Sequence, residues 1–151
     1  MKDEWQTPEY IVDYLQSMYG KFTWDACCNK NNCLVDYQRE SLDFEDYNYL
    51  NWISNGNDLI FLNPPYSNIA PFIKKAWTDS LSSKVIVLVP ITVLSCKYMD
   101  FLDEGNEVIR KWVKGLIIET VSRRIRFTHH SLKQSSPPAG SVLIIMDRRG
   151  R

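Results

Sequence analysis

The sequence Leu59-Ile60-Phe61-Leu62-Asn63-Pro64-Pro65-Tyr66-Ser67 gives the clearest indication of how this chain folds. Its first four residues form a short apolar run, which indicates a buried strand. The residues after it place apolar side chains at helical spacing, namely Ile69, Phe72, Ile73, Ala76 and Trp77. Because two consecutive prolines fix two φ angles and remove two backbone donors, the segment between strand and helix should be a stiff turn. We therefore predict an α/β unit whose turn lies at the carboxyl end of a strand, where open α/β sheets bind ligands.

The turn itself carries the candidate catalytic residues Asn63, Pro64, Pro65 and Tyr66. An exocyclic amine of a nucleobase is a poor nucleophile, because its lone pair is delocalised into the ring. The Asn63 side-chain oxygen and the Pro64 carbonyl could accept hydrogen bonds from such an amine and make its nitrogen more nucleophilic. Tyr66 could stack on the base, a contact worth roughly 1–3 kcal/mol in nucleic-acid sites. The alternative is a proline-stiffened turn with an incidental tyrosine.

The Asn-Pro-Pro-Tyr sequence resembles the catalytic motif of amino methyltransferases, which use S-adenosylmethionine. More narrowly, the chain resembles the small phage and prophage DNA adenine-N6 methyltransferases, the Dam-like family. The matching segments come in the family's order and are Trp5-Gln6-Thr7-Pro8, Trp24-Asp25-Ala26, Asn63-Pro64-Pro65-Tyr66-Ser67, Val89-Pro90, Arg124-Ile125-Arg126-Phe127 and Pro138-Ala139-Gly140-Ser141. The tetrapeptide alone also occurs in methyltransferases that act on RNA or on glutamine side chains, so the ordered set is the more specific signal.

The resemblance implies S-adenosylmethionine as the cofactor and indicates which residues would bind it. Thr7 would line the pocket for its methionine part, with Trp5 as an aromatic wall. Asp25, after the first strand, would meet the positive charge of the cofactor. Read from the residues alone, Thr7 is a helix cap with Pro8 at the first helical position. Asp25 could likewise be a plain carboxylate at a strand end.

The resemblance also implies an acidic residue that faces the adenosine part of the cofactor. Asp43 is the candidate, and Glu40 and Glu45 compete with it. The loop after Asp25 lacks the glycines usual in cofactor loops and carries only small side chains, Ala26-Cys27-Cys28-Asn29. Small residues permit close approach of the backbone, but without the freedom of glycine at positive φ.

Composition limits the classes of protein that fit. A length of 151 residues suits one domain with a sizeable core. No apolar run approaches the roughly 20 residues of a membrane span, and the acidic N-terminus does not resemble a signal peptide, so we expect a cytoplasmic protein. Cys27, Cys28, Cys33 and Cys96 lack the spacing of a zinc site, which predicts free, mostly buried thiols and no metal.

The zero net charge hides a division of charge along the chain. Residues 1–109 carry 8 Lys and Arg against 16 Asp and Glu, whereas residues 110–151 carry 10 against 2. This basic third predicts a DNA-facing surface, with a merely solvated basic surface as the alternative. Three arginines beside Phe127 suit phosphates and an unstacked base, namely Arg123, Arg124 and Arg126. His129 and His130 are expected to face solvent or phosphate rather than a metal, because neighbours on a strand point to opposite faces.

The rest of the chain predicts further helices and strands. We expect a helix from Thr7-Pro8 that ends at Gly20, and strands at 22–27, 84–90, 116–118 and 142–146. Residues 30–52 have no clean period and predict loops, and residues 91–109 predict a loop plus a helix. With the resemblance, these elements predict a single Rossmann-like α/β methyltransferase domain over residues 1–151, trimmed relative to larger members and with a mainly parallel sheet.

The function that these expectations support is methyl transfer from S-adenosylmethionine to the N6 amine of adenine in DNA. In duplex DNA the base would have to leave the stack. No metal is needed, because a sulfonium is already a good leaving group. Two alternatives stay open: methylation of RNA or of a protein glutamine, and a non-catalytic DNA-binding or decoy protein that keeps the fold. The sequence leaves the recognition site and the oligomeric state open.

Overall fold

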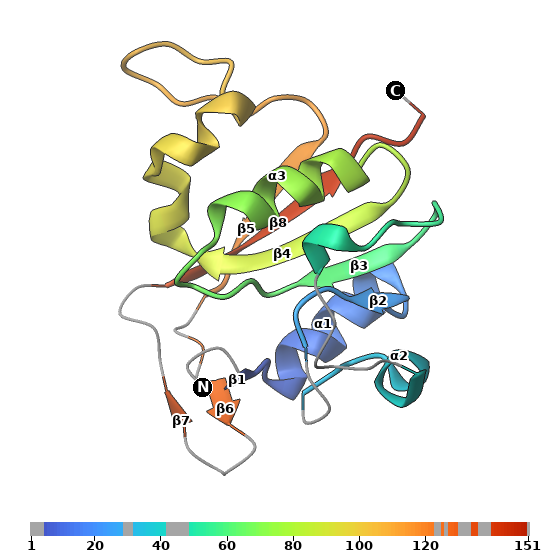
Figure 1. Ribbon diagram of the computed structural model, residues 1–151. Coiled ribbons are helices and arrows are strands. Elements are labelled where there is room, and N and C mark those ends of the chain that lie inside the picture. The colour runs from blue at the N-terminus through green and yellow to red at the C-terminus, as the bar shows by residue number, and fades with distance from the viewer. Residues whose placement is uncertain are drawn as a thin grey trace.

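A mixed five-stranded sheet forms the centre of the computed structural model, which describes residues 5–28, 32–41, 49–122, 125, 127–129, 134–135 and 140–150 (Figure 1). In spatial order its strands are β2 (Trp24–Asp25), β3 (Leu59–Leu62), β4 (Lys84–Pro90), β8 (Ser141–Asp147) and β5 (Leu116–Thr120). The first three strands are parallel to one another, and β8 is antiparallel to both of its neighbours.

The expectation of a mainly parallel sheet is therefore wrong, although the α/β architecture is confirmed. The β8 strand is buried over Ser141–Met146, so its sequence is a continuous apolar run. Such a run is typical of parallel strands covered by helices on both faces. A central antiparallel strand covered in the same way has the same pattern, and the direction of the strand therefore could not be predicted from it.

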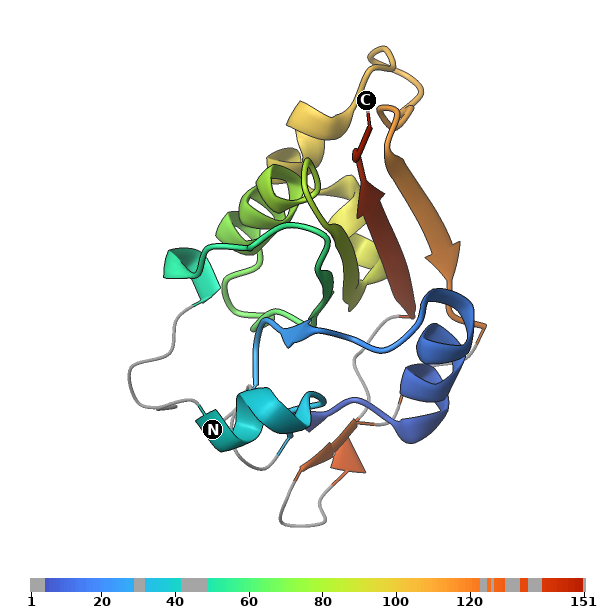
Figure 2. The same ribbon diagram turned by 90° about the vertical axis from the view of Figure 1, so that its right-hand side faces the viewer.

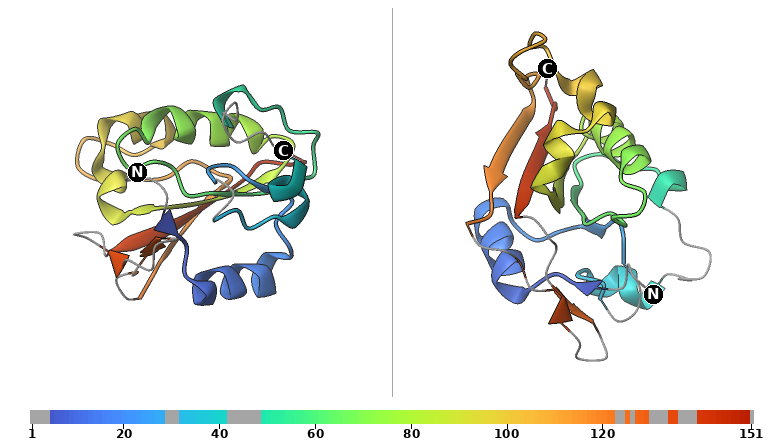
Figure 3. Two further views of the ribbon diagram at one scale, coloured as in Figure 1. Left: turned by 60° about the horizontal axis from the view of Figure 1, so that its bottom comes forward. Right: turned by 90° about the vertical axis from the view of Figure 1, so that its left-hand side faces the viewer.

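Helical segments cover both faces of this sheet (Figures 2 and 3). One face is covered by α1 (Glu9–Tyr19) and the other by α3 (Ala70–Asp79), with the 3₁₀ helices η2 (Ile91–Ser95) and η3 (Lys97–Leu102) beside it. Two cores result. The core on the α3 side includes Ile60, Leu62, Phe72, Ile73, Val85, Val87, Met99 and Leu102. The core on the α1 side includes Ile11, Leu15, Phe61, Ile86, Leu88, Leu143 and Ile145.

The α1 helix ends as predicted but begins one residue later than predicted. It ends at Gly20, whose φ of 97° lies in the region that favours glycine. Pro8 is its N-cap, and no side chain caps it, so Thr7 is not the helix cap. The hydroxyl groups of Tyr14 and Tyr19 donate to the Glu119 carboxylate on β5 at 3.1 Å and 3.0 Å. These two bonds fix the helix to the outermost strand, β5.

The segment predicted as loops contains two short helices, α2 (Asp36–Ser41) and η1 (Tyr49–Asn51). Asp36, taken as a loop residue, is the first residue of α2. The helix is too short to repeat an apolar period, so its sequence could not indicate it. The strand expected at 22–27 is shorter than predicted, with only two residues in β2.

The helix expected within 91–109 is also wrong, because this segment contains only 3₁₀ turns and a loop. Met99 and Leu102 are buried, whereas Val108 and Ile109 are exposed. The Asn106 side-chain oxygen accepts hydrogen bonds from the N–H groups of both residues, at 2.9 Å each. Such side-chain bonds to the backbone compete with helix formation.

A second, small sheet contains β1 (Trp5–Gln6), β6 (Phe127–His129) and β7 (Gln134–Ser135), all antiparallel. It lies near the end of β4 in Figure 1. Its β1–β6 pairing joins the N-terminal segment to the basic third of the chain. Within the described ranges, no helix has both the length and the apolar character that crossing a membrane requires.

Candidate active site at the edge of the sheet

The parallel strands β2, β3 and β4 have their carboxyl ends at one edge of the sheet, and Asp25 and Asn63 lie there. Asp25 is the last residue of β2 and pairs with Phe61 of β3. Asn63 directly follows β3, so it lies two residues after Phe61 along the chain. β4 continues to Pro90, three residues beyond Val87, which pairs with Leu62 at the end of β3. The predicted strand, turn and helix around Asn63 are confirmed, since β3 is buried throughout and α3 begins at Ala70.

The Asn-Pro-Pro-Tyr loop is a tight turn that leaves its tyrosine partly exposed. Pro64 is buried, Asn63 and Pro65 are half-buried, and Tyr66 is 38% exposed. The Asn68 N–H donates to the Pro65 carbonyl at 3.0 Å and closes the turn before α3. Burial raises the pKa of the Tyr66 hydroxyl, which therefore stays protonated near neutral pH. A protonated, partly exposed ring can stack on a base without placing a negative charge near DNA.

Thr7 and Asn63 lie together, although they are far apart in the sequence. The Asn63 side-chain Nδ2 donates to Thr7 Oγ1 at 3.5 Å. This contact joins a residue predicted for the cofactor to one predicted for the amine. Both side chains are half-buried, which leaves part of each accessible at the edge of the sheet.

Asp25 lies at this edge with its side chain turned inward, only 2% exposed. Its Oδ2 accepts a hydrogen bond from the Leu34 N–H at 3.1 Å. Burial raises the pKa of this carboxyl to about 7, although hydrogen bonds from the backbone N–H groups of Leu34 and Cys27 oppose the rise. Near neutral pH the Asp25 carboxyl is therefore held between its charged and uncharged forms, and a nearby cation would favour the charged form.

Gln38, on α2, is a site residue that the sequence did not indicate. Its fully buried side chain accepts from the Asp25 N–H and donates to the Asp25 carbonyl, both at 2.7 Å. The two bonds hold the backbone of Asp25 in the way a neighbouring strand would. A glutamine in a polar segment without a period gives no signal of this role.

Asp25 also lies in a group with Cys28 and Cys33, whose ligand atoms are all within 4.8 Å of one another. Of the four cysteines, Cys33 is buried and the other three are half-buried. A carboxylate and two thiolates are ligands that zinc accepts, and a structural zinc site usually takes four. A hydrogen bond with Cys33 and burial raise the pKa of the Cys28 thiol, which favours its protonated form. The spacing of these residues in the sequence did not indicate this group.

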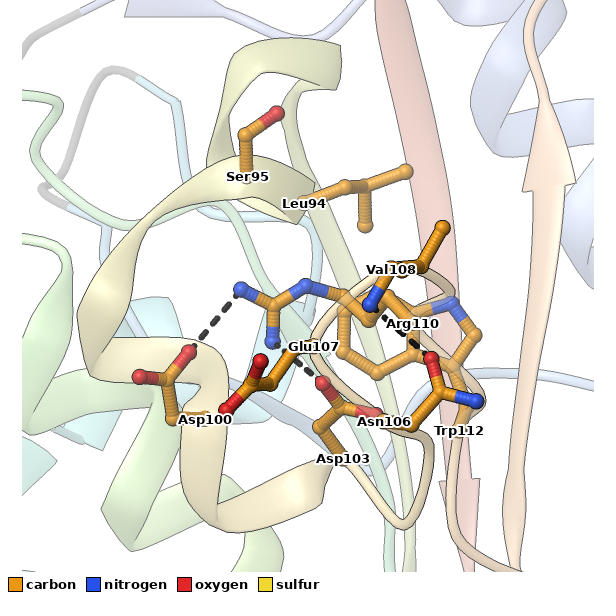
Figure 4. Close-up of a pocket in the computed structure, with 9 residues that line it drawn as sticks. All are labelled: Leu94, Ser95, Asp100, Asp103, Asn106, Glu107, Val108, Arg110 and Trp112. Carbon is orange, nitrogen blue, oxygen red and sulfur yellow. Dashed lines mark hydrogen bonds and ion pairs between the residues drawn. The ribbon is translucent and has the colours of Figure 1, made fainter.

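A separate pocket of about 670 Å³ lies between η2, η3 and the loop after them, and none of the predicted site residues lines it (Figure 4). Arg110 occupies its centre, with ion pairs to Asp100 at 2.9 Å and to Asp103 at 3.4 Å. The guanidinium also lies 5.3 Å from the centre of the Trp112 ring. The acidic groups of the pocket are thus partly neutralised from within the chain.

Several predicted site residues lie outside the described residues, namely Asp43, Arg123, Arg124, Arg126 and His130. Trp5 is described through its backbone in β1, where it pairs with His129 of β6. Its predicted role as an aromatic wall, like the role of Asp43, stays a prediction.

Comparison with known proteins identifies the family. A sequence model of the family described as "DNA N-6-adenine-methyltransferase (Dam)" matches residues 1–150. A protein of Escherichia phage T1 named DNA N-6-adenine-methyltransferase is 27% identical over 124 residues, which are 80% of this chain and 49% of that protein. A protein of the same name from Haemophilus phage HP1 (strain HP1c1) is 31% identical over 101 residues, which are 66% of this chain and 56% of that protein.

The chain thus spans about half the length of these phage relatives. No solved structure matches it. The resemblance drawn from the ordered motifs is confirmed, because the family match runs from residue 1 to residue 150. The chain belongs to the Dam family of DNA N-6-adenine-methyltransferases.

Proposed function

We propose that this chain transfers a methyl group from S-adenosylmethionine to the N6 amine of adenine in DNA, as a single Rossmann-like domain. The observation that carries the proposal is the position of the Asn63–Tyr66 loop, which follows a buried parallel strand and lies beside Asp25 at one edge of the sheet. Membership of the Dam family supports the same activity. The setting of the reaction would be the cytoplasm of a bacterial host.

The residues at this edge fit a cationic cofactor. S-adenosylmethionine supplies an electrophilic methyl group on a sulfonium and also carries an ammonium. Burial disfavours the charged form of Asp25, so a cation beside this carboxylate would offset that cost. Thr7, with Trp5 and Asp43, would complete the binding site. A sulfonium is already a good leaving group, so the proposed reaction needs no metal.

The Asn-Pro-Pro-Tyr loop supplies the groups that meet the base. The Asn63 Oδ1 and the Pro64 carbonyl would accept hydrogen bonds from the two N–H groups of the amine and keep its lone pair directed at the methyl group. Tyr66 would stack on the adenine after the base leaves the duplex. Placement and hydrogen bonding of this kind lower the barrier without a covalent intermediate.

The basic third of the chain, residues 110–151, would hold the phosphates of the DNA. The β1–β6 pairing supports this arrangement, because it brings part of the basic third beside the strand that leads into Thr7. Arg123, Arg124 and Arg126 precede β6 in the sequence and are the proposed phosphate contacts.

The test is transfer of a labelled methyl group to DNA, RNA and total protein by the purified chain, in the presence of EDTA. We expect label in DNA, as N6-methyladenine. Asn63→Ala should lower turnover by roughly 10²–10³, the scale seen when one group aimed at the transition state is removed. The same variant should bind the cofactor within a few-fold by calorimetry, because its hydrogen bonds are made to the base.

Label in RNA or protein instead of DNA would assign another acceptor, and full activity of Asn63→Ala would remove the catalytic role of this loop. Binding of DNA without transfer or cofactor binding would favour a decoy. Loss of activity with EDTA, restored by zinc, would assign the Asp25, Cys28 and Cys33 group to a metal.

A further inference from the structure

Thr7 lies at a junction that is fixed on both sides. The preceding residue, Gln6, pairs with Thr128 in the β1–β6 ladder. The following residue, Pro8, is the N-cap of α1, and its carbonyl accepts hydrogen bonds from the Ile11 and Val12 N–H groups at 3.1 Å and 3.3 Å. The backbone of Thr7 is thus held by a strand and by a helix, which is the kind of support that a precisely placed side chain needs.

The Thr7 hydroxyl is directed to Asn63 and not to the helix. The α1 helix has no side-chain cap, whereas the Asn63 Nδ2 donates to Thr7 Oγ1 at 3.5 Å. This distance is long for a hydrogen bond. Catalytic hydrogen bonds are often long before substrates bind and shorten in the reactive complex.

The contact determines what the Asn63 amide can offer to a substrate. A primary amide has two donors on its nitrogen and an acceptor on its oxygen, pointing in different directions. An amine donates, so it selects the orientation in which Asn63 Oδ1 faces it. In that orientation Nδ2 needs an acceptor of its own, since Asn63 is half-buried and a donor shielded from water is unfavourable without a partner. Thr7 Oγ1 is placed to be this acceptor.

We propose that Thr7 is a positioning residue that fixes the plane and orientation of the Asn63 amide for the acceptor amine. The proposal rests on the proposed function and differs from the cofactor-lining role that the family resemblance implies for Thr7. The two roles make opposite predictions. A positioning residue changes turnover with little effect on cofactor affinity, whereas a lining residue changes cofactor affinity first.

The experiment measures kcat, KM for DNA and the Kd for S-adenosylmethionine in matched variants. Thr7→Val removes the hydroxyl and keeps the shape of the side chain. We expect its kcat to fall by about 10-fold to 10²-fold, the scale of a small misplacement of a reacting group, with KM and Kd within a few-fold. Thr7→Ser keeps the hydroxyl and should restore most of kcat. Thr78→Val, on the exposed surface of α3, is the control and should leave all three constants unchanged.

A double variant separates this proposal from a purely structural effect. Because Thr7 acts through Asn63, adding Thr7→Val to Asn63→Ala should cost little beyond Asn63→Ala alone. An equal further decrease in kcat, a weakened Kd with normal kcat, or a failure of Thr7→Ser to restore activity would each overturn the positioning role. If valine does not fit, Thr7→Ala provides the same comparison, with thermal unfolding as the check that each variant folds.

The failure of the proposed function has a different signature. In that case Asn63→Ala itself would keep its activity on DNA, whatever the Thr7 variants do. Loss of activity in Asn63→Ala with normal turnover in Thr7→Val would instead leave the proposed function intact and overturn only the role of Thr7.

Discussion

Asp25 holds a loop in place through its hydrogen bonds, and its carboxyl can still ionise. Its backbone is bonded to Gln38, and its side chain accepts from the Leu34 N–H. These bonds hold the loop without any bound ligand. The raised pKa, about 7, means that the negative charge is only partly present at neutral pH. The cofactor would meet a carboxyl whose ionisation is coupled to its own binding.

This coupling predicts a pH-dependent affinity for S-adenosylmethionine. Burial raises the pKa of Asp25 in the free protein, and a bound cation favours the charged form, so binding should release a proton. Affinity should therefore increase as the pH rises from 6 to about 7 and level off above it. Calorimetry in two buffers of different ionisation enthalpy measures the released proton. Asp25→Asn should bind more weakly and show neither effect, and a proton release that persists in this variant would exclude Asp25 as its source.

Ser141 offers a second test at the scale of one residue. It is the first residue of β8, opposite Pro90, and its side chain is fully buried. Its hydroxyl forms no hydrogen bond within the part of the chain that the structure describes. Because a buried hydroxyl without a partner destabilises the fold, Ser141→Ala should raise the free energy of unfolding by about 1 kcal/mol in urea denaturation.

The matched control is Ser83→Ala. Ser83 is equally buried, but its hydroxyl contacts Ser54 Oγ at 2.8 Å and accepts from the Asp58 N–H at 3.1 Å. Removing this hydroxyl should lower the free energy of unfolding. A decrease of similar size in Ser141→Ala would mean that the Ser141 hydroxyl has a partner in the folded protein.

Among the helices and strands, those with a strong local pattern were predictable. β3, the turn after it and α3 combine an apolar run, two prolines and a helical period in one short stretch. The C-cap at Gly20 and the extent of β4 followed from equally local signals. The antiparallel direction of β8 could not be predicted in this way. Strand direction depends on the path of the chain between distant segments, and a buried strand has the same apolar sequence in either direction.

For the candidate site, only the positions of some predicted residues can be compared with the sequence. The order of the motifs indicated Thr7, Asn63 and Asp25, and the structure brings the first two into contact, whereas the roles of all three stay predictions. The sequence did not indicate the buried Gln38, nor the approach of Cys28 and Cys33 to Asp25. Both depend on how a segment without a period folds back on β2, which tertiary contacts decide.

The basic segment gives a prediction for the salt dependence of DNA binding. Each phosphate that the protein no longer neutralises should lower the slope of log affinity against log salt by about 0.9. Replacing Arg123, Arg124 and Arg126 with Gln should therefore flatten the slope while cofactor binding stays unchanged. Fluorescence anisotropy over a range of salt concentrations measures it, with Arg149→Gln as a comparison near the end of β8. An unchanged slope would move the DNA-binding surface to another part of the molecule.

At the scale of the whole molecule, the two cores depend on one strand. β8 lies between β4 and β5 and pairs with β4 from Pro90 to Lys84. Its side chains enter both cores, with Val142 and Ile144 on the α3 side and Leu143 and Ile145 on the α1 side. Without β8 the edge strand β5 has no neighbour in the main sheet, and β4 would be left with an open edge.

The position of β8 has a consequence for synthesis. On the ribosome β4 and β5 emerge before the strand that joins them, so the sheet cannot close until residues 141–147 have left the exit tunnel. A chain that ends at residue 140 should therefore lack a cooperative thermal transition and be digested rapidly by protease, whereas a chain that ends at residue 150 should resist. Cooperative unfolding of the shorter chain would show that the sheet is stable without β8. Until β8 arrives, the exposed edge of β4 is open to pairing with other chains, and this interval is when the protein is most at risk of aggregation.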